Sequence, residues 1–261
     1  MKRLFDDGRQ IWEIVPSEIT EAPSNILSKY NPFVKKKSKC FDDYNIYSIQ
    51  RYWDRRFLYW PNFDSGICTD TVGLYSVTPW DSAVQIAQTL DSYYPNDSSI
   101  IVDACCGVGG NTVAFSRCIN GSNVIGVDTN STRLICAKNN SKVSGSEIYT
   151  DFVRDDAINF VSSLRGTARF VFSSPPWGGP GYSIKTLQDI PFDVFALMEA
   201  TMKGCIGNNG RLVLYLPRHF PVKEAKKLVI KGTKMSKFDV TTGKDEKVIA
   251  SCFLYGKPKN S

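Results

Sequence analysis

The sequence predicts an α/β domain built on a seven-stranded, mostly parallel sheet, with a small helical extension in front of it. From residue 99 onward, β-branched apolar runs alternate with helical patterns, which is typical of parallel strands joined by crossover helices. The last two apolar runs instead flank Gly243-Lys244-Asp245, a turn that indicates an antiparallel hairpin. With 261 residues and 42% hydrophobic content, the chain can bury a full core.

The expected strands and helices alternate in chain order. The strands are 99–105, 123–127, 148–153, 169–173 and 211–216, followed by the hairpin strands 237–242 and 247–255. The helices between them are 111–119, 131–141, 156–164, 191–205 and 221–230. Because each crossover returns the chain to the same end of the sheet, the carboxyl ends of the five parallel strands meet at one edge.

The chain ahead of the sheet divides into two parts. Residues 1–43 contain Pro and Ser without a clear period and predict an irregular arm. Residues 44–95 predict a helical extension or lid, and residues 96–261 the sheet domain. Within 44–60, apolar side chains recur at helical spacing, which favours an amphipathic helix packed on the core. They are Ile46, Ile49, Trp53, Phe57 and Trp60. An RNA-facing basic side, with Arg51 and Arg55, is the alternative.

Composition limits the class of protein. The formal net charge of +6 allows a polyanionic partner but does not require one. Six lysines make the C-terminal portion basic, either as a solvated face or as phosphate contacts. They are Lys223, Lys226, Lys227, Lys231, Lys234 and Lys237. The eight cysteines include no CxxC pair and the single histidine is His219, so no zinc site is predicted. Without an apolar leader or a membrane-length run, we expect a reduced nuclear or cytoplasmic protein without metal or membrane.

A glycine-rich turn at the end of the first strand indicates a nucleoside cofactor. Gly107 and Gly109 lead into a helix N-terminus that begins near Asn111, so a ligand can approach the backbone closely. The next strand ends at Asp128, where a carboxylate can hold a ribose diol. A NAD-type fingerprint would need a third glycine where Thr112 stands, which disfavours hydride chemistry.

S-adenosylmethionine fits this turn better than a dinucleotide, because it lacks a pyrophosphate and carries an amine. Asp103 is the expected partner of that amine. Asp155 or Asp156, directly after the third strand, can accept from the adenine amino group, although either could instead cap the helix at 157–164. Ser174, after the fourth strand, lies across the sheet edge from Gly107, so cofactor and substrate would meet there.

The loop after the fourth strand favours binding of a nucleobase amine. Pro175 and Pro176 fix φ and lack N–H donors, which leaves the Ser174 and Pro175 carbonyls to accept from an amine. Trp177 offers a large aromatic face that would attract a positively charged base. A proline-rich turn with its Trp packed into the core is the alternative interpretation.

These segments together resemble the trimethylguanosine synthase family of RNA cap guanosine-N2 methyltransferases, over roughly residues 50–255. The similar segments are Arg51-Tyr52-Trp53 with Arg55, Phe63-Asp64-Ser65-Gly66, Tyr75-Ser76-Val77-Thr78-Pro79, Asp103 with Cys106-Gly107-Val108-Gly109-Gly110-Asn111, Ser174-Pro175-Pro176-Trp177-Gly178-Gly179-Pro180 and Leu216-Pro217-Arg218. The resemblance implies a Rossmann-like class I fold that methylates N2 of a 7-methylguanosine cap with S-adenosylmethionine. One methyl would give 2,7-dimethylguanosine and two would give 2,2,7-trimethylguanosine, a choice that stays open.

By that resemblance the site residues fall into two sets. Ser174, Pro175 and Trp177 would hold the reacting base, with Ser173, Arg55 and Arg218 as further substrate contacts; Arg218 could equally be a paired surface arginine. The cofactor contacts would be Tyr75, Thr78, Pro79, Asp103, Gly107, Asn111, Thr112, Asp128, Asp155 and Asp156. Capped RNAs resembling small nuclear and small nucleolar RNAs would be the substrates of a monomeric enzyme.

Three positions depart from the family pattern. Trp80 stands where an acid is usual, Leu74 replaces an aromatic residue and Gly181 replaces an Asp before Tyr182. They affect the lid and the loop rather than the cofactor motif. Two other functions stay open at this point: N-methylation of another RNA or DNA base amine, and a cap-binding module without catalysis.

Overall fold

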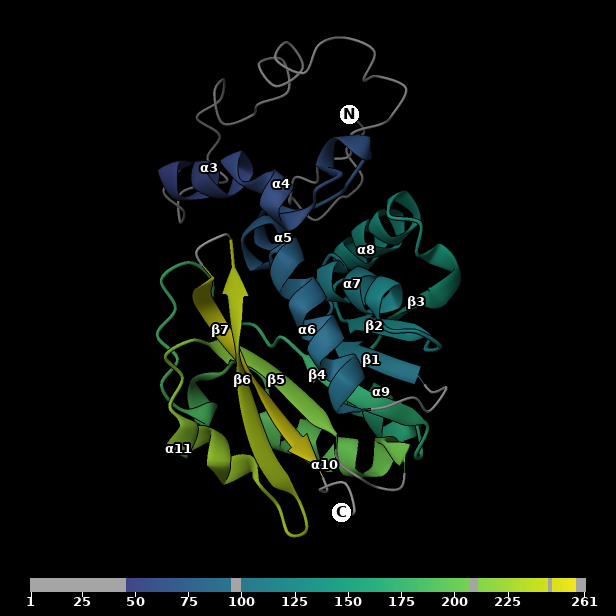
Figure 1. The fold of residues 1–261 in the computed structure, drawn as a ribbon, viewed down its shortest axis with the longest axis vertical. Coiled ribbons are helices and arrows are strands. Elements are labelled where there is room, and N and C mark those ends of the chain that lie inside the picture. The colour runs from purple at the N-terminus through teal and green to yellow at the C-terminus, as the bar shows by residue number, and fades with distance from the viewer. Residues whose placement is uncertain (1–45, 95–99, 207–210, 244–245, 257–261) are drawn as a thin grey trace.

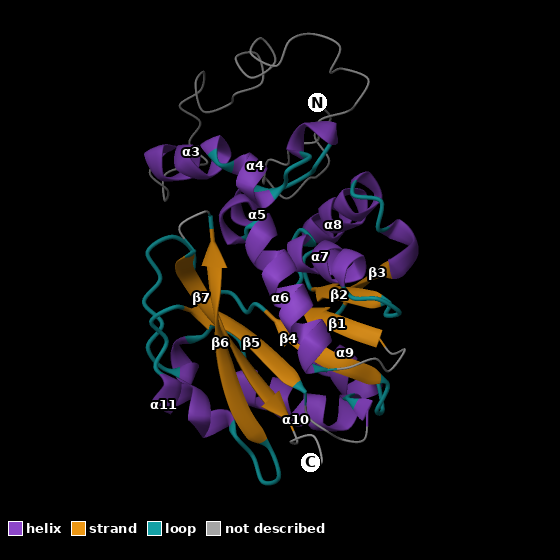
Figure 2. Ribbon diagram, viewed as in Figure 1, coloured by secondary structure: helices purple, strands orange, loops and turns teal. Residues whose placement is uncertain are grey.

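The computed structural model describes residues 46–94, 100–206, 211–243 and 246–256. A seven-stranded sheet runs through its centre with helices on both faces (Figures 1 and 2). The strands are β1 (Ile100–Ala104), β2 (Val124–Asp128), β3 (Thr150–Arg154), β4 (Ala168–Ser173), β5 (Leu212–Pro217), β6 (Lys234–Thr242) and β7 (Lys247–Gly256). Their order is β3-β2-β1-β4-β5-β7-β6.

The strand pairing confirms the predicted fold class. β1 to β5 are parallel, whereas β7 is antiparallel to both β5 and β6. The predicted arm at 1–43 lies outside the described residues. None of the described helices combines the length and apolar character needed to cross a bilayer.

Crossover helices follow the parallel strands as predicted, with one difference in length. They are α7 (Gly110–Cys118), α8 (Ser131–Val143), α9 (Ala157–Ser163), α10 (Val194–Gly204) and α11 (Val222–Ala225). The predicted helix 221–230 is wrong in extent, because α11 passes into a 3-10 turn at Lys226–Leu228. Side chains cap three of the others: Asn130 caps α8, Asp156 caps α9 and Asp193 caps α10.

The core forms on both faces of the sheet. One face packs under α9, α10 and α11, and the other under α6 (Trp80–Tyr93) and α7. Ile86, Ala87 and Leu90 of α6 are completely buried. The buried Arg169 of β4 ties the end of this helix to the sheet, because its Nε donates to the Tyr94 carbonyl at 2.8 Å.

The segment before the sheet is broken where one helix was predicted. It forms α3 (Ile46–Asp54) and α4 (Arg56–Tyr59), then a 3-10 turn at Phe63–Ser65 and α5 (Thr71–Ser76). The single helix over 44–60 is therefore wrong. Arg56 turns inward, with its guanidinium 4.9 Å from the Trp53 ring and 4.4 Å from the Phe57 ring. As a result Phe57 stays 43% exposed instead of packing on the core, whereas Trp60 is buried.

Candidate active site

A cavity of about 790 Å³ opens at the carboxyl edge of the sheet. Its walls come from α4 and α5, the turn after β1, the ends of β2 and β3, the loop after β4, and β5. Most of the residues predicted for the site line it together, although the sequence separates them by as much as a hundred positions. These are Tyr75, Thr78, Pro79, Gly107, Asn111, Asp128, Asp155, Asp156, Ser174, Pro175 and Trp177.

Two predicted cofactor residues, Asp103 and Thr112, lie beneath the cavity rather than in its wall. The Thr112 hydroxyl donates to Asp103 Oδ2 at 2.6 Å, and both side chains are buried. The other oxygen, Asp103 Oδ1, has no hydrogen-bond partner among the described residues. Burial raises the pKa of Asp103 to about 7, and the Thr112 hydrogen bonds oppose that rise. Asp103 therefore joins β1 to α7 directly below the glycine turn.

Three predicted substrate residues also lie outside the cavity wall. Ser173 is completely buried at the end of β4. Arg55 is exposed at the break between α3 and α4. Arg218 is exposed just after β5, where its Nε donates to His219 Nε2 at 2.9 Å and its Nη1 donates to the Val248 carbonyl at 3.3 Å. Ser173 immediately precedes Ser174, which lines the cavity, and Arg218 contacts Val248, the neighbour of the lining residue Ile249.

The turn after β1 brings backbone and carboxylate together. Gly107 has φ +56°, in the left-handed region that favours glycine, and a Cβ there would meet nothing within 4 Å. Its N–H donates to Asp128 Oδ2 at 2.9 Å, while Asn130 N–H donates to Asp128 Oδ1 at 2.9 Å. Each carboxylate oxygen keeps a further lone pair, so Asp128 can still accept from a ligand in the cavity.

Asn111 carries an unused acceptor in the cavity wall. Its Nδ2 donates to Thr78 Oγ1 at 3.1 Å, which ties α7 to the segment before α6. Its Oδ1 is buried and has no partner among the described residues. A buried acceptor left without a donor is costly, so this oxygen is suited to a donor supplied by a ligand.

The two acidic residues after β3 have different tasks. Asp156 caps α9, since its Oδ1 accepts from Ile158 N–H at 2.9 Å and Asn159 N–H at 3.0 Å. The capping interpretation therefore holds for Asp156, although the residue also lines the cavity. Asp155 lines the cavity too, and within the described residues its Oδ1 accepts one hydrogen bond, from the Asp156 N–H at 2.7 Å.

Three aromatic rings form one wall of the cavity. Trp177 stacks on Tyr215 with ring centroids 5.5 Å apart and an interplanar angle of 26°. Tyr182 meets Trp177 edge-on at 5.1 Å and 69°. The Tyr215 ring thus covers one face of the Trp177 indole. Neither tyrosine was predicted as a site residue from the sequence. Tyr215 could have been found as an aromatic residue with a polar hydroxyl near the carboxyl end of an otherwise aliphatic strand.

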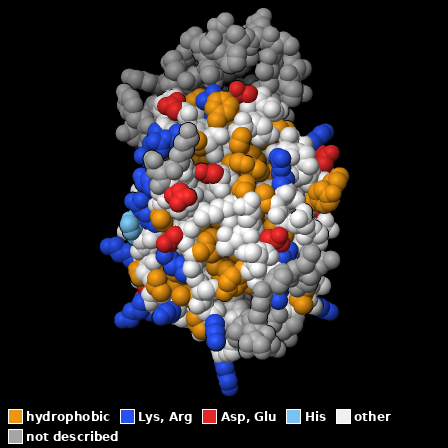
Figure 3. Space-filling view, viewed as in Figure 1, with side chains coloured by type: hydrophobic (Ala, Val, Ile, Leu, Met, Phe, Trp, Pro, Cys, Tyr) orange, Lys and Arg blue, Asp and Glu red, His pale blue; other side chains and the backbone are white. Residues whose placement is uncertain are grey.

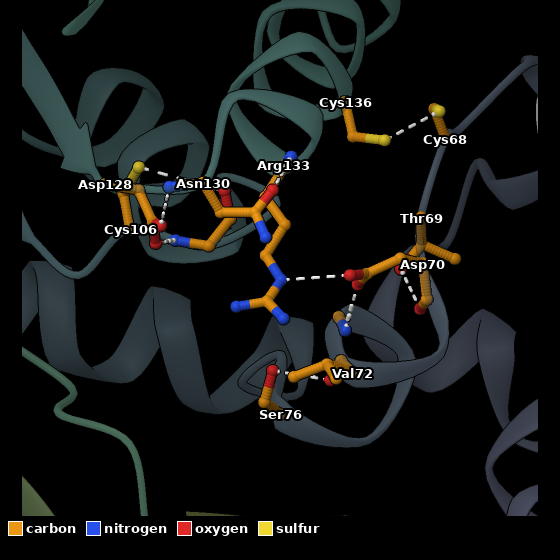
Figure 4. Close-up of polar contacts among 12 residues, drawn as sticks. Cys68, Thr69, Asp70, Val72, Ser76, Cys106, Asp128, Asn130, Arg133 and Cys136 are labelled. Carbon is orange, nitrogen blue, oxygen red and sulfur yellow. Dashed lines mark hydrogen bonds and ion pairs between the residues drawn. The ribbon is translucent and has the colours of Figure 1, made fainter. Parts of the chain in front are cut away.

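An ion pair joins α8 to the lid helix α5 (Figure 4). Arg133 Nε donates to Asp70 Oδ2 at 3.0 Å, and Asp70 Oδ1 accepts from Gly73 N–H at 2.5 Å as the N-cap of α5. The carboxylate is 2% exposed and the arginine, which lines the cavity, 19%. Sequence reasoning missed this pair. The sequence feature that could have indicated the pair is a cation in the first turn of α8, because the helix dipole disfavours positive charge there.

A second attachment fixes the chain just before this lid. Asn140 Oδ1 accepts from Cys68 N–H at 2.7 Å, and Asn140 Nδ2 donates to the carbonyls of Cys68 at 2.8 Å and Val108 at 3.0 Å. The Cys68 and Cys136 sulfurs lie 2.8 Å apart (Figure 4). One buried amide on α8 therefore holds both the base of the lid and the glycine turn.

Comparison with known proteins identifies the family. The sequence model described as RNA cap guanine-N2 methyltransferase matches residues 98–257. The chain belongs to this family. It is 33% identical over 187 residues to trimethylguanosine synthase of Schizosaccharomyces pombe, covering 68% of this chain and 74% of that protein. It is 28% identical over 178 residues to trimethylguanosine synthase of Saccharomyces cerevisiae, covering 65% of this chain and 54% of that protein.

A solved structure supports the fold of this guanine-N2 methyltransferase. NSun6 from Pyrococcus horikoshii matches with a TM-score of 0.52 at 19% identity, covering 69% of this chain and 52% of that one. The chain is thus an enzyme with a Rossmann-like methyltransferase fold that methylates N2 of a cap guanine. Membership of the family excludes the non-catalytic module.

S-adenosylmethionine is the methyl donor of this enzyme, and the residues present fit it. Across the ranges that the structure describes, the buried Asn111 Oδ1 lacks a donor, the Gly107 backbone leaves open space and Asp128 retains lone pairs. Among the described residues, no group of three or more His, Cys, Asp or Glu side chains could hold a metal ion.

Proposed function

We propose that this enzyme transfers methyl groups to N2 of a guanine that already carries an N7-methyl group, with Trp177 as the platform for the base. The stack of Trp177 on Tyr215 is the observation that carries the proposal. Since one indole face is covered, a base enters on the other face only. A 7-methylguanine ring bears positive charge, which adds cation–π attraction of about 0.5–2 kcal/mol to stacking.

Ser174 and Pro175 orient the amine in this proposal. Both residues line the cavity beside Trp177, and Pro175 and Pro176 contribute no N–H donors to the loop. Their carbonyl oxygens accept the two N2–H groups and aim the nitrogen lone pair across the sheet edge. Ser173, buried at the strand end, supports the loop from below.

The other half of the cavity holds the cofactor. Asp128 would accept from the ribose hydroxyls, Asp155 would accept from the adenine amino group, and Asn111 Oδ1 would accept from the methionine ammonium. Tyr75, Thr78 and Pro79 cover the ligand from the lid side. Asp103 and Thr112 act indirectly, since their hydrogen bond fixes the start of α7 beneath Gly107. When bound, S-adenosylmethionine supplies a methyl group made electrophilic by the adjacent sulfonium.

Positioning supplies most of the rate enhancement. Holding N2 in line with the methyl group can lower the barrier by about 7–11 kcal/mol, because the encounter becomes intramolecular. Transfer would form the N2–CH3 bond as the S–CH3 bond breaks and the neutral thioether leaves. The proton on the resulting cationic nitrogen would be strongly acidic, so solvent suffices as its acceptor. The Ser174 and Pro175 carbonyls would hold that proton by a hydrogen bond until it leaves.

We further propose that N2 accepts two methyl groups in succession, giving 2,7-dimethyl- and then 2,2,7-trimethylguanosine. The names of both curated relatives support this second step. Caps of small nuclear and small nucleolar RNAs are the proposed substrates, and the enzyme is proposed to act as a monomer in the nucleus or cytoplasm.

Methyl incorporation from labelled S-adenosylmethionine tests the proposal. We expect label on 7-methyl-GTP and none on GTP, with products carrying one and two new methyl groups. Trp177→Ala should abolish most of the incorporation, whereas Tyr149→Ala, an exposed aromatic outside the cavity, should leave it unchanged. Equal labelling of GTP and 7-methyl-GTP would overturn the role of the N7-methyl group.

A further inference from the structure

The connection from β5 into β6 carries the net charge of the whole chain. Residues 218–237 contain seven basic residues and one acidic residue, Glu224, so their net charge of +6 equals that of the entire sequence. The basic residues are Arg218, Lys223, Lys226, Lys227, Lys231, Lys234 and Lys237. The other residues of the chain are therefore neutral in sum.

These side chains are exposed, and few of them have an acidic partner. Lys227 pairs with Glu224 at 2.6 Å and Lys237 pairs with Asp239 at 2.5 Å. In the part of the chain that the structure describes, no ion pair involves Lys223, Lys226 or Lys231. Figure 3 shows basic side chains along the edge of the molecule that carries the histidine.

Folding fixes this connection against the sheet. The Tyr255 hydroxyl donates to the Ala225 carbonyl of α11 at 2.9 Å, and Tyr255 of β7 is the register partner of Met235 in β6. Ala225 and Leu228 are buried in the core. The segment that carries these exposed cations is thus anchored to the sheet and the core. Lys234 and Lys237 are set aside because they lie on edge strand β6, where charge also discourages edge-to-edge pairing. The remaining basic residues of the connection are called the basic strip. The basic strip consists of Arg218, Lys223, Lys226, Lys227 and Lys231.

The basic strip begins at the mouth of the cavity. Arg218 follows β5 directly, and its Nη1 donates to the Val248 carbonyl beside Ile249, which lines the cavity. Burial raises the pKa of Tyr182, and the positive charge of Arg218 opposes that rise, so the two side chains are close. Tyr182 in turn contacts Trp177.

We propose that the basic strip binds the phosphate backbone of the RNA that follows the cap. This inference rests on the proposed function, because it needs the cap guanine to stack on Trp177. A polyanion leaving the cavity beside Tyr182 meets Arg218 first, and then the lysines of α11 and of the turns that follow it. Lysines act as flexible point charges that suit phosphates without reading the base sequence.

Charge removal on the strip tests the proposal. The variant Lys223→Gln/Lys226→Gln/Lys231→Gln is compared with Lys138→Gln/Lys142→Gln/Lys203→Gln, which removes the same charge from exposed positions on α8 and α10. The two substrates are 7-methyl-GTP and a 7-methylguanosine-capped RNA of about 20 nucleotides, which exceeds the usual single-strand site sizes. KM is measured for each at several salt concentrations.

We expect the strip variant to raise KM for the capped RNA between about tenfold and a hundredfold at about 0.1 M salt. The reason is that each lost phosphate contact with a single strand lowers the slope of log affinity against log salt concentration by about 0.7. KM for 7-methyl-GTP should stay unchanged, and the control variant should match the wild type on both substrates. Equal KM values for capped RNA in the two variants would overturn the proposal. Absence of transfer to 7-methyl-GTP by the wild type would instead refute the proposed function itself.

Discussion

On the side of the cavity formed by β1, β2 and β3, polar side chains are held by hydrogen bonds, whereas on the side formed by β4 and β5, aromatic rings and prolines make the wall. We call these the glycine-turn side, with Gly107, Asn111 and Asp128, and the proline-loop side, with Trp177 and Tyr215. On the glycine-turn side, contact with a ligand depends on charge and on lone pairs that remain available. On the proline-loop side it depends on flat surfaces. One cavity can therefore hold two chemically different ligands, and a mutation on one side should weaken the binding of one ligand and not of the other.

The largest expected effect comes from the proline-loop side. Trp177→Ala should lower kcat/KM for 7-methyl-GTP about a hundredfold, because stacking of a base on an aromatic side chain contributes about 1–3 kcal/mol. The dissociation constant of S-adenosylmethionine, measured by calorimetry, should change by less than twofold. A comparable loss of cofactor affinity would show that the two sides are not separate.

The matching change on the glycine-turn side is Asp128→Asn. It replaces a charged acceptor by an amide, and a hydrogen bond to a charged group contributes about 1.5–3 kcal/mol, so cofactor affinity should fall about thirtyfold. KM for 7-methyl-GTP at saturating cofactor should stay the same. Asp151→Asn, an exposed position on β3 outside the cavity, is the control and should leave the affinity unaltered.

The buried carboxyl of Asp103 makes the glycine-turn side sensitive to pH. Its pKa is raised to about 7, so between about pH 4 and pH 7 the folded protein binds a proton that the unfolded chain has released. The free energy of unfolding should therefore fall as pH rises through this window, by up to about 1.4 kcal/mol per pH unit, and change no further above it.

Urea unfolding of the wild type and Asp103→Asn between pH 5 and pH 8 measures this contribution. The stability of the wild type relative to the variant should decline from pH 5 to pH 7 and then level off. Parallel curves over the whole range would mean that Asp103 is ionised throughout.

The smallest expected effect concerns the ion pair between Arg133 and Asp70. In a double-mutant cycle with Arg133→Gln and Asp70→Asn, cofactor affinity should reveal a coupling of about 1 kcal/mol, since the carboxylate is buried but the arginine is partly exposed. Asp70→Asn keeps an oxygen to cap α5. The pair Lys227 and Glu224, which lies outside the cavity, provides the control cycle, in which Lys227→Gln and Glu224→Gln should show no coupling to cofactor affinity.

The sheet was predictable because its strands are short apolar runs bounded by turns. β1 and β2 lie within a residue or two of the predicted limits, and the hairpin turn at Gly243 was expected. The helices were less certain where tertiary contacts overrode local pattern. Arg56 breaks the first helix by turning into an aromatic cluster, which periodicity does not encode. Helix α6, which buries Ile86 on the sheet, was not separately predicted.

The candidate site was predictable where its parts are adjacent in sequence. The glycine turn and the proline loop are continuous motifs that follow strand ends, so their residues could be placed on one edge. The aromatic support of Trp177 comes from Tyr182 and Tyr215, and only folding brings Tyr215 beneath the ring. The ion pair between Arg133 and Asp70 likewise depends on folding, because the two residues are 63 positions apart in the sequence.

The amide of Asn140 also bears on how the protein can be shortened for laboratory work. Two of its hydrogen bonds join it to the backbone of Cys68, which precedes the family match that starts at residue 98, and a third reaches the Val108 carbonyl within that match. A fragment starting at residue 98 would leave a buried amide unsatisfied and strip α6, with Ile86 and Leu90, from the sheet. Expression of the catalytic unit should therefore begin upstream of Trp60, with the buried aromatic residues included.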